Sequence, residues 1–160
     1  MGLPVDVNEL REKAKKNITI ADHMFYVTYN LFNDPKILIA ILEHLFLSLS
    51  SAMSCLLYYD RYYNRIPQFT GNFEEKFTFF RKKSAKTHKI DKEFIRLIKN
   101  IKEVIIAHKQ SPVEFIRKNK FVICTNNYYM RTLSSDQVKE NLIKTKSFIN
   151  KIDSIITNEQ

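Results

Sequence analysis

One long apolar stretch in the first half of the chain limits the folds that this sequence can adopt. Residues Ile37 to Leu57 read ILIAILEHLFLSLSSAMSCLL, which is long enough to cross a lipid bilayer as a helix. Glu43 and His44 interrupt the run, and ionisable side chains are costly in hydrocarbon when charged. A helix that is apolar on nearly all sides also suits the centre of a helical bundle. We therefore expect a buried central helix and no membrane partner, with these side chains in the core: Ile41, Leu45, Leu49, Met53 and Leu56.

Elsewhere in the chain, apolar residues recur at the spacing of one helix face. The sequence has only two glycines and four prolines among 160 residues, which favours long helices over a turn-rich sandwich or barrel. No linker divides the chain, so we predict a single all-α domain over residues 1–160, an antiparallel bundle of about five helices. Besides the central helix, which begins after Asn33-Asp34-Pro35, helices are expected from Val7 to about Phe32, from Asn72, from Asp91 and from Ser134.

A short β element is predicted before the last helix. Two β-prone runs, residues 120–124 and 128–133, flank the polar segment 125–127. Such runs around an Asn-Asn pair are typical of a hairpin, so we expect a small β-hairpin near residues 120–133. Ser111 and Glu114 have the spacing of a helix cap, which predicts one further helical turn just before this hairpin.

The charge of the chain bears on its partners. A formal net charge of +9 attracts phosphate backbones, anionic lipid or acidic protein surfaces, although a biased composition or a need for solubility would also account for it. Cys55 and Cys124 lack metal-ligand spacing, and the residues at the amino terminus lack the apolar core of a signal peptide, so a reducing, cytoplasmic setting is expected. The sequence contains no phosphate-binding loop, dinucleotide fingerprint or zinc motif, and we expect no cofactor and no metal.

The end of the predicted fourth helix carries the segment with a possible chemical role, Lys102-Glu103-Val104-Ile105-Ile106-Ala107-His108. A basic–polar pair followed by a histidine, within this helical arrangement, resembles the HEPN family. In that family an arginine, a polar residue and then a histidine form the signature, and many members are metal-independent ribonucleases that act as dimers. The resemblance implies a homodimer in which His108 is the general base, Lys102 faces phosphate and Glu103 occupies the polar position.

Lys102 departs from the family pattern, because lysine offers a point charge without the planar two-pronged grip of arginine. We therefore predict a non-catalytic, basic, HEPN-like binding module that associates with RNA or with a nucleic-acid-handling partner. A metal-independent ribonuclease that uses His108 is the alternative, and a protein–protein scaffold is a second one. His108 also has a structural interpretation, as a side chain that caps the end of its helix.

Three basic segments are candidates for contacts with nucleic acid. The run Tyr58–Arg65 interleaves rings with guanidinium groups, as in proteins that stack single-stranded bases, although the same rings would also close a bundle. The segment 81–89 and the hairpin region are basic, which fits phosphate contacts or merely solvated surface. The candidate residues are Arg61, Tyr62, Arg65, Arg81, Lys82, Lys83, Lys86, Arg117, Lys118, Lys120 and Arg131.

Overall fold

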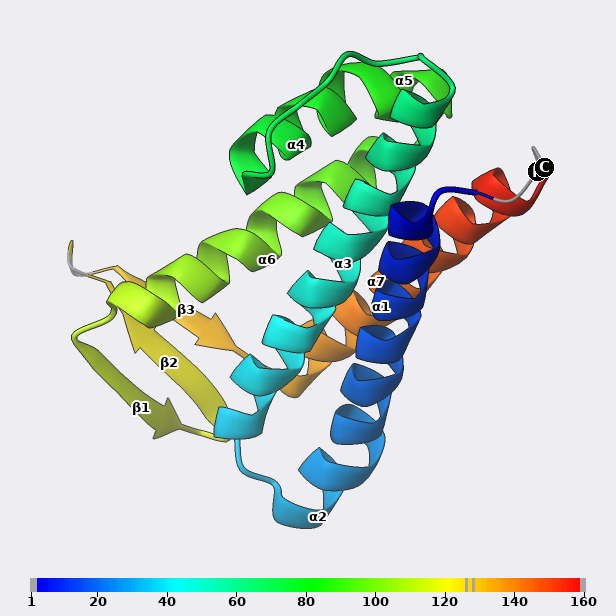
Figure 1. The fold of residues 1–160 in the computed structure, drawn as a ribbon. Helices are drawn as coiled ribbons and strands as arrows, with labels where there is room; N and C mark the ends of the chain where they lie inside the picture. Colours follow the sequence, from blue (N-terminus) through cyan, green and yellow to red (C-terminus); the bar gives the residue numbers. More distant parts are fainter. Residues whose placement is uncertain (1–2, 126, 128, 159–160) are drawn as a thin grey trace.

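The computed structural model describes residues 3–125, 127 and 129–158. Within them, five helices and a small antiparallel sheet make up the fold, which confirms the predicted mainly α-helical bundle (Figure 1). Three helices are regular: α3 (Lys36–Tyr62), α6 (Lys92–Gln110) and α7 (Ser135–Asn158). The other two contain π-helical turns, which the sequence did not predict. One runs through α1 (Val5–His23), η1 (Met24–Tyr29) and α2 (Asn30–Phe32), and the other through α4 (Phe73–Phe79), η2 (Phe80–Ser84) and α5 (Ala85–Thr87).

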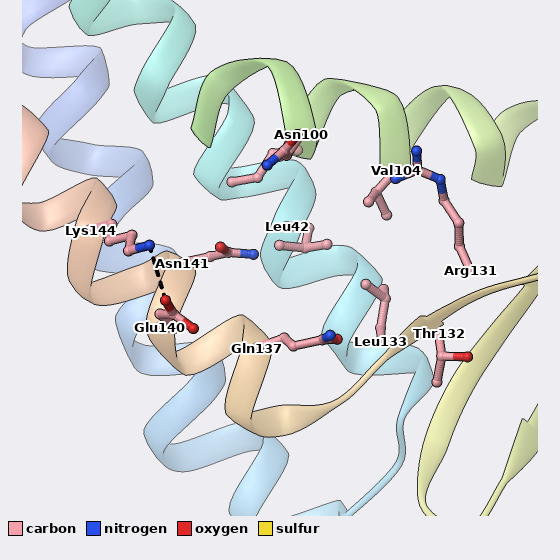
Figure 2. Close-up of a pocket in the computed structure, with 11 residues that line it drawn as sticks. Leu42, Asn100, Val104, Arg131, Thr132, Leu133, Gln137, Glu140, Asn141 and Lys144 are labelled. Carbon is pink, nitrogen blue, oxygen red and sulfur yellow. Dashed lines mark ion pairs between the residues drawn. The ribbon is translucent and has the colours of Figure 1, made fainter. Parts of the chain in front are cut away.

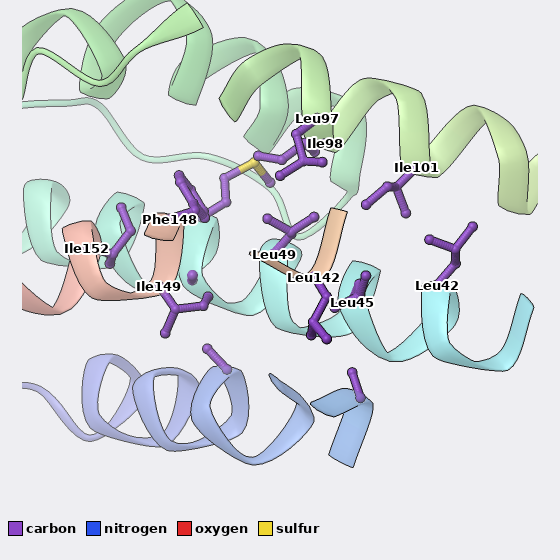
Figure 3. Close-up of a cluster of buried hydrophobic side chains, with 14 of the residues drawn as sticks. Leu42, Leu45, Leu49, Leu97, Ile98, Ile101, Leu142, Phe148, Ile149 and Ile152 are labelled. Carbon is purple, nitrogen blue, oxygen red and sulfur yellow. The ribbon is translucent and has the colours of Figure 1, made fainter. Parts of the chain in front are cut away.

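The hydrophobic core is built around α3, as the apolar run predicts. The five side chains expected in the core, from Ile41 to Leu56, are all 0% exposed. Figure 1 shows α3 in the middle of the bundle, with α1 and α7 alongside it and α6 crossing it. Figure 3 shows part of the layer in which side chains of α3 meet those of α6 and α7. By length and composition α3 is also the one helix of the described chain that could cross a membrane, but most of its apolar segment is buried inside the bundle.

Side-chain caps determine where several helices begin. The Asn72 side chain accepts a hydrogen bond from the N–H of Glu75 at 2.8 Å, at the start of α4. Ser134 and Gln137 each accept a hydrogen bond from the backbone N–H of the other, at 3.3 and 3.2 Å, which is a capping box at the start of α7. Asp91 caps α6. The helix starts predicted at these three positions are therefore confirmed.

The sheet contains β1 (Val113–Arg117), β2 (Lys120–Cys124) and β3 (Met130–Leu133), in the order β1-β2-β3 and antiparallel throughout. The predicted hairpin is present as the β2–β3 pair, in which Cys124 lies opposite Met130. Asn126 and Tyr128, which the prediction included in this hairpin, lie outside the described residues.

The prediction of a further helical turn at residues 111–114 was wrong, because β1 occupies this part of the chain. Val113, Phe115 and Ile116 are β-branched or aromatic residues, which favour a strand when a partner strand is available. The partner is β2, which folds back through the two-residue turn Lys118-Asn119, both at positive φ. Pairing with a strand that follows in the chain therefore outweighs the local capping signal.

Candidate functional site

A pocket surrounded by positive charges lies where α5 turns into α6. It encloses about 490 Å³, and its floor is apolar, since Ala85 and Ile90 are buried and Ile95 is half-buried. Every ionisable side chain that lines it is basic and exposed. These side chains are Arg81, Lys86, Lys89, Lys92 and Arg96, and we refer to this site as the basic pocket.

The basic pocket lies at the tight turn that ends α5 and leads into α6. Lys89 has φ 54°, in the left-handed region, and its N–H bonds back to the carbonyl oxygen of Lys86 at 3.4 Å. The N–H of Ile90 bonds to the carbonyl oxygen of Ala85 at 2.8 Å, which completes a Schellman ending. Asp91 then caps α6, so the chain reverses within a few residues. As a result, the last turns of η2 and α5 stand beside the first turns of α6.

The cations of the basic pocket have no acidic partner within the described part of the chain. Arg81 lies over the ring of Phe77, 5.8 Å from the ring centroid, and this contact leaves its charge uncompensated. Like charges held together repel one another, and an anionic ligand would relieve that repulsion. An apolar floor inside a ring of cations fits a ligand that carries both an apolar face and negative charge.

The predicted basic run of residues 81–89 lies at this site. Arg81 and Lys86 line the basic pocket, and Lys82 and Lys83 are exposed on η2 next to it. Lys89 belongs to the same predicted run. The remaining two pocket cations, Lys92 and Arg96, were not predicted, because the run and the helix that follows it were considered separately. A signal was present, since Lys92 and Arg96 are four apart on an exposed helix face.

The aromatic–arginine segment at the end of α3 packs largely on itself. The Arg61 guanidinium lies 4.5 Å from the ring centroid of Tyr58. Arg65 donates a hydrogen bond to the buried Asp60 at 3.1 Å. Tyr62 remains 43% exposed. In this segment, therefore, both arginines have partners inside the fold, and Tyr62 offers its ring to solvent.

The other predicted basic residues lie far from the basic pocket. Arg117, Lys118 and Lys120 are exposed at and beside the β1–β2 turn. Arg131 on β3 pairs with Glu103, at 3.2 Å. Figure 1 shows the sheet and α5 at opposite ends of the molecule. The two predicted patches are therefore separate surfaces.

His108, near the end of α6, is held by a strand rather than by its own helix. Its Nδ1 lies 2.6 Å from Oε2 of Glu114 on β1, and the two side chains are 28% and 25% exposed. The ring of Phe121 packs against the imidazole at 6.2 Å between centroids. A carboxylate on one ring nitrogen orients an imidazole in the way that many general bases are held.

The structure does not bring Lys102 to His108. Lys102 pairs with Glu74 at 2.9 Å and lies 3.6 Å from the ring centroid of Phe73, so it is turned toward α4. Glu103 is turned toward β3, where it pairs with Arg131. The three residues that resemble the HEPN signature thus contact three different parts of the fold.

A buried polar cluster that the sequence analysis missed joins the end of α3 to the helix α4–η2–α5. Asp60 is 0% exposed, and its carboxylate accepts a hydrogen bond from Ser84 at 2.6 Å. Nε2 of His88 lies 2.8 Å from the same carboxylate, and Arg65 donates a further hydrogen bond. Burial alone would raise the pKa of Asp60, but the hydrogen bonds from His88, Ser84 and Arg65 outweigh it and hold this pKa below its ordinary value. Because the Ser84 hydroxyl donates to Asp60, the cluster is arranged for stability rather than for a serine–histidine relay.

A second cleft, of about 400 Å³, lies between α6, α7, β3 and α3 (Figure 2). Its floor includes Leu42, and carboxamides line it from both helices. Unlike the basic pocket, this cleft has compensated charges: Lys144 pairs with Glu140 and Glu93, each at 3.0 Å, and Arg131 pairs with Glu103. The hydrogen bonds that the Lys144 ammonium donates to Glu140 and Glu93 also raise its pKa. This cleft therefore offers much less attraction for a polyanion.

The described residues contain no cluster of three or more histidine, cysteine, aspartate or glutamate side chains placed to hold a metal ion. The chain matches no protein-family model, no curated protein and no solved structure.

Proposed function

We propose that this protein is a non-catalytic binding module for single-stranded nucleic acid, RNA above all, and that the basic pocket is its binding site. The observation that carries the proposal is a pocket lined by five cations over an apolar floor, where the described residues provide these cations with no acidic partner. Single-stranded nucleic acid presents phosphates together with unstacked base faces, whereas a duplex hides those faces. The pocket offers both kinds of contact in one place.

The separation of Lys102 from His108 supports binding without cleavage. A ribonuclease of the HEPN kind needs a cation beside its general base, and here each of the two side chains has its own partner elsewhere. The His108–Glu114 pair is the one feature that favours the ribonuclease alternative. An imidazole alone provides a proton acceptor, but nothing that holds the scissile phosphate.

Fluorescence anisotropy with a short labelled single-stranded RNA tests the proposal. Four cations of the basic pocket are replaced together by glutamine: Arg81, Lys86, Lys92 and Arg96. We expect RNA affinity to fall by at least about tenfold, since four exposed phosphate contacts of about 0.5 kcal/mol each sum to about 2 kcal/mol, and a tenfold change corresponds to about 1.4 kcal/mol.

A control variant removes the same charge from the opposite end of the molecule. It replaces four exposed cations by glutamine: Lys109, Arg117, Lys118 and Lys120. We expect this variant to bind RNA within about threefold of the wild type, because charge at that distance is largely screened at physiological salt. Equal losses in both variants would mean that only net charge matters, and would refute a site at the basic pocket.

A further inference from the structure

The strand β1 has an open edge. In the hairpin β1–β2, the two-residue turn makes Arg117 and Lys120 a hydrogen-bonded pair. Hydrogen-bonded and non-hydrogen-bonded pairs alternate along the strands, so every second residue of β1, counted back from Arg117, bonds to β2 through its backbone. The N–H and C=O groups of Glu114 and Ile116 therefore point away from β2. The hydrogen bonds between β2 and β3 agree with this pattern. The N–H of Thr125 bonds to the carbonyl oxygen of Tyr129 at 2.8 Å, so the odd-numbered residues of β2 face β3 and the even-numbered ones face β1. Among the described residues, β1 pairs with β2 alone, and Figure 1 shows no element beyond it.

Apolar side chains accompany this open edge on both faces of the sheet. Val113 is 54% exposed and Ile116 45%, and Phe115 is 38% exposed. Val122 lies beside Phe115 on the face that the helices do not cover, and it is buried without belonging to the main core. Proteins that remain monomeric usually protect such an edge with charge, proline or a bulge, and β1 has no such protection between Val113 and Ile116 apart from Glu114, which His108 engages.

We propose that β1 pairs with β1 of a second copy of this chain, antiparallel and centred on Phe115. In this register Glu114 of one copy and Ile116 of the other exchange both of their outward hydrogen bonds, and the two Phe115 side chains face each other across the two-fold axis. All five residues of each strand overlap. The result is a continuous six-stranded sheet with a symmetric interface.

The charges around β1 favour the antiparallel over the parallel arrangement of two copies. Each chain carries a net charge of +9, and Arg117, Lys118 and Lys120 cluster at one end of the strand. An antiparallel pair places these two basic ends at opposite limits of the interface, whereas a parallel pair would place them side by side. The remaining repulsion between the copies is long-range, so added salt should strengthen this dimer.

Disulfide trapping tests the register. In the Cys124→Ser background, Phe115→Cys places two cysteines opposite each other in a non-hydrogen-bonded pair, where Cα atoms are about 4.5 Å apart and a disulfide can form. The natural Cys55 does not interfere, since it is buried and burial raises the pKa of its thiol to about 12. Val113→Cys is the matched control, because Val113 lies on the same face and is more exposed, but its two copies would be about 13 Å apart along the strands. We expect most Phe115→Cys protein to become a covalent dimer under mild oxidation and Val113→Cys protein to remain monomeric.

Analytical ultracentrifugation tests the backbone pairing without any cysteine. Ile116→Pro removes an outward N–H that β2 does not use, whereas Ile116→Ala keeps it, so the first variant should lose the concentration-dependent dimer of the wild type and the second should retain it. Circular dichroism establishes that both variants fold. A wild type that stays monomeric at the highest concentration, a dimer that Ile116→Pro leaves intact, or equal cross-linking at positions 113 and 115 would each overturn the proposal. Neither experiment depends on RNA binding.

Discussion

Replacing Asp60 by alanine should destabilise the protein far more than the same replacement of a partly exposed aspartate. Asp60 is fully buried at the end of α3, and its carboxylate is the common acceptor for Ser84, His88 and Arg65. Alanine would leave the Ser84 hydroxyl and the His88 imidazole buried without their acceptor. The change would also disconnect α3 from α5, where the basic pocket begins.

The expected magnitude follows from these contacts. A hydrogen bond to a charged group contributes about 1.5–3 kcal/mol, but the carboxylate also gave up its hydration when it was buried. Removal of one member of a buried ion pair costs about 3–5 kcal/mol, and we expect Asp60→Ala to lie in this range. Asp153 is the control, because it accepts hydrogen bonds from Arg11 at 2.5 Å and from Lys15 at 3.2 Å but keeps 33% of its side chain exposed. Asp153→Ala should cost about 1 kcal/mol or less.

Urea unfolding followed by far-UV circular dichroism measures both values. The pKa of Asp60 is lowered by folding, so its contribution is fully present above the pKa of the unfolded chain and is lost as the pH falls below about 4. The difference in unfolding free energy between wild type and Asp60→Ala should therefore shrink below about pH 4. A loss of under about 1 kcal/mol at neutral pH, or a difference that stays constant through the acid range, would refute the role assigned to this cluster.

Three further predictions concern the core, His108 and the helix ending at the basic pocket. Leu45→Ala should cost about 2–5 kcal/mol in urea unfolding, because Leu45 is 0% exposed at the centre of the bundle, and a cost below about 0.5 kcal/mol would contradict the central role of α3. His108→Ala should cost about 1 kcal/mol through loss of the partly exposed pair with Glu114, and should change no RNA cleavage. Metal-independent cleavage by the wild type that both His108→Ala and Lys102→Ala abolish would instead establish the ribonuclease alternative. Lys89→Gly should stabilise the protein by about 0.5–1 kcal/mol, since Lys89 has φ 54°, and a loss of stability would contradict the strained helix ending.

The sequence predicted the elements that depend on local signals. The apolar run of α3 and the caps at Asn72 and Ser134 involve residues close together in the chain, so periodicity and capping rules find them. β1 was missed because its strand character depends on pairing with β2, which follows it and is not visible in a five-residue window.

The candidate site was only partly predictable for a similar reason. The basic run containing Arg81 and Lys86 is continuous in the sequence, but the pocket is completed by Lys92 and Arg96 only after the reversal at Lys89. Lysine seldom adopts the left-handed conformation, so nothing in the composition marked this turn. The Asp60–His88 contact joins residues 28 apart in the chain and could not be found from spacing at all.

The salt dependence of RNA binding tests the central claim most directly. Single-stranded RNA affinity is measured by anisotropy between about 50 and 200 mM salt for the wild type and for the variant that lacks four cations of the basic pocket. If the five cations of the pocket each neutralise a phosphate, the slope of log affinity against log salt should approach about −3.5, at about 0.7 per phosphate. The variant should bind weakly, with a slope near about −0.7. A wild-type slope near zero, or the same slope in both proteins, would contradict binding of nucleic acid at the basic pocket.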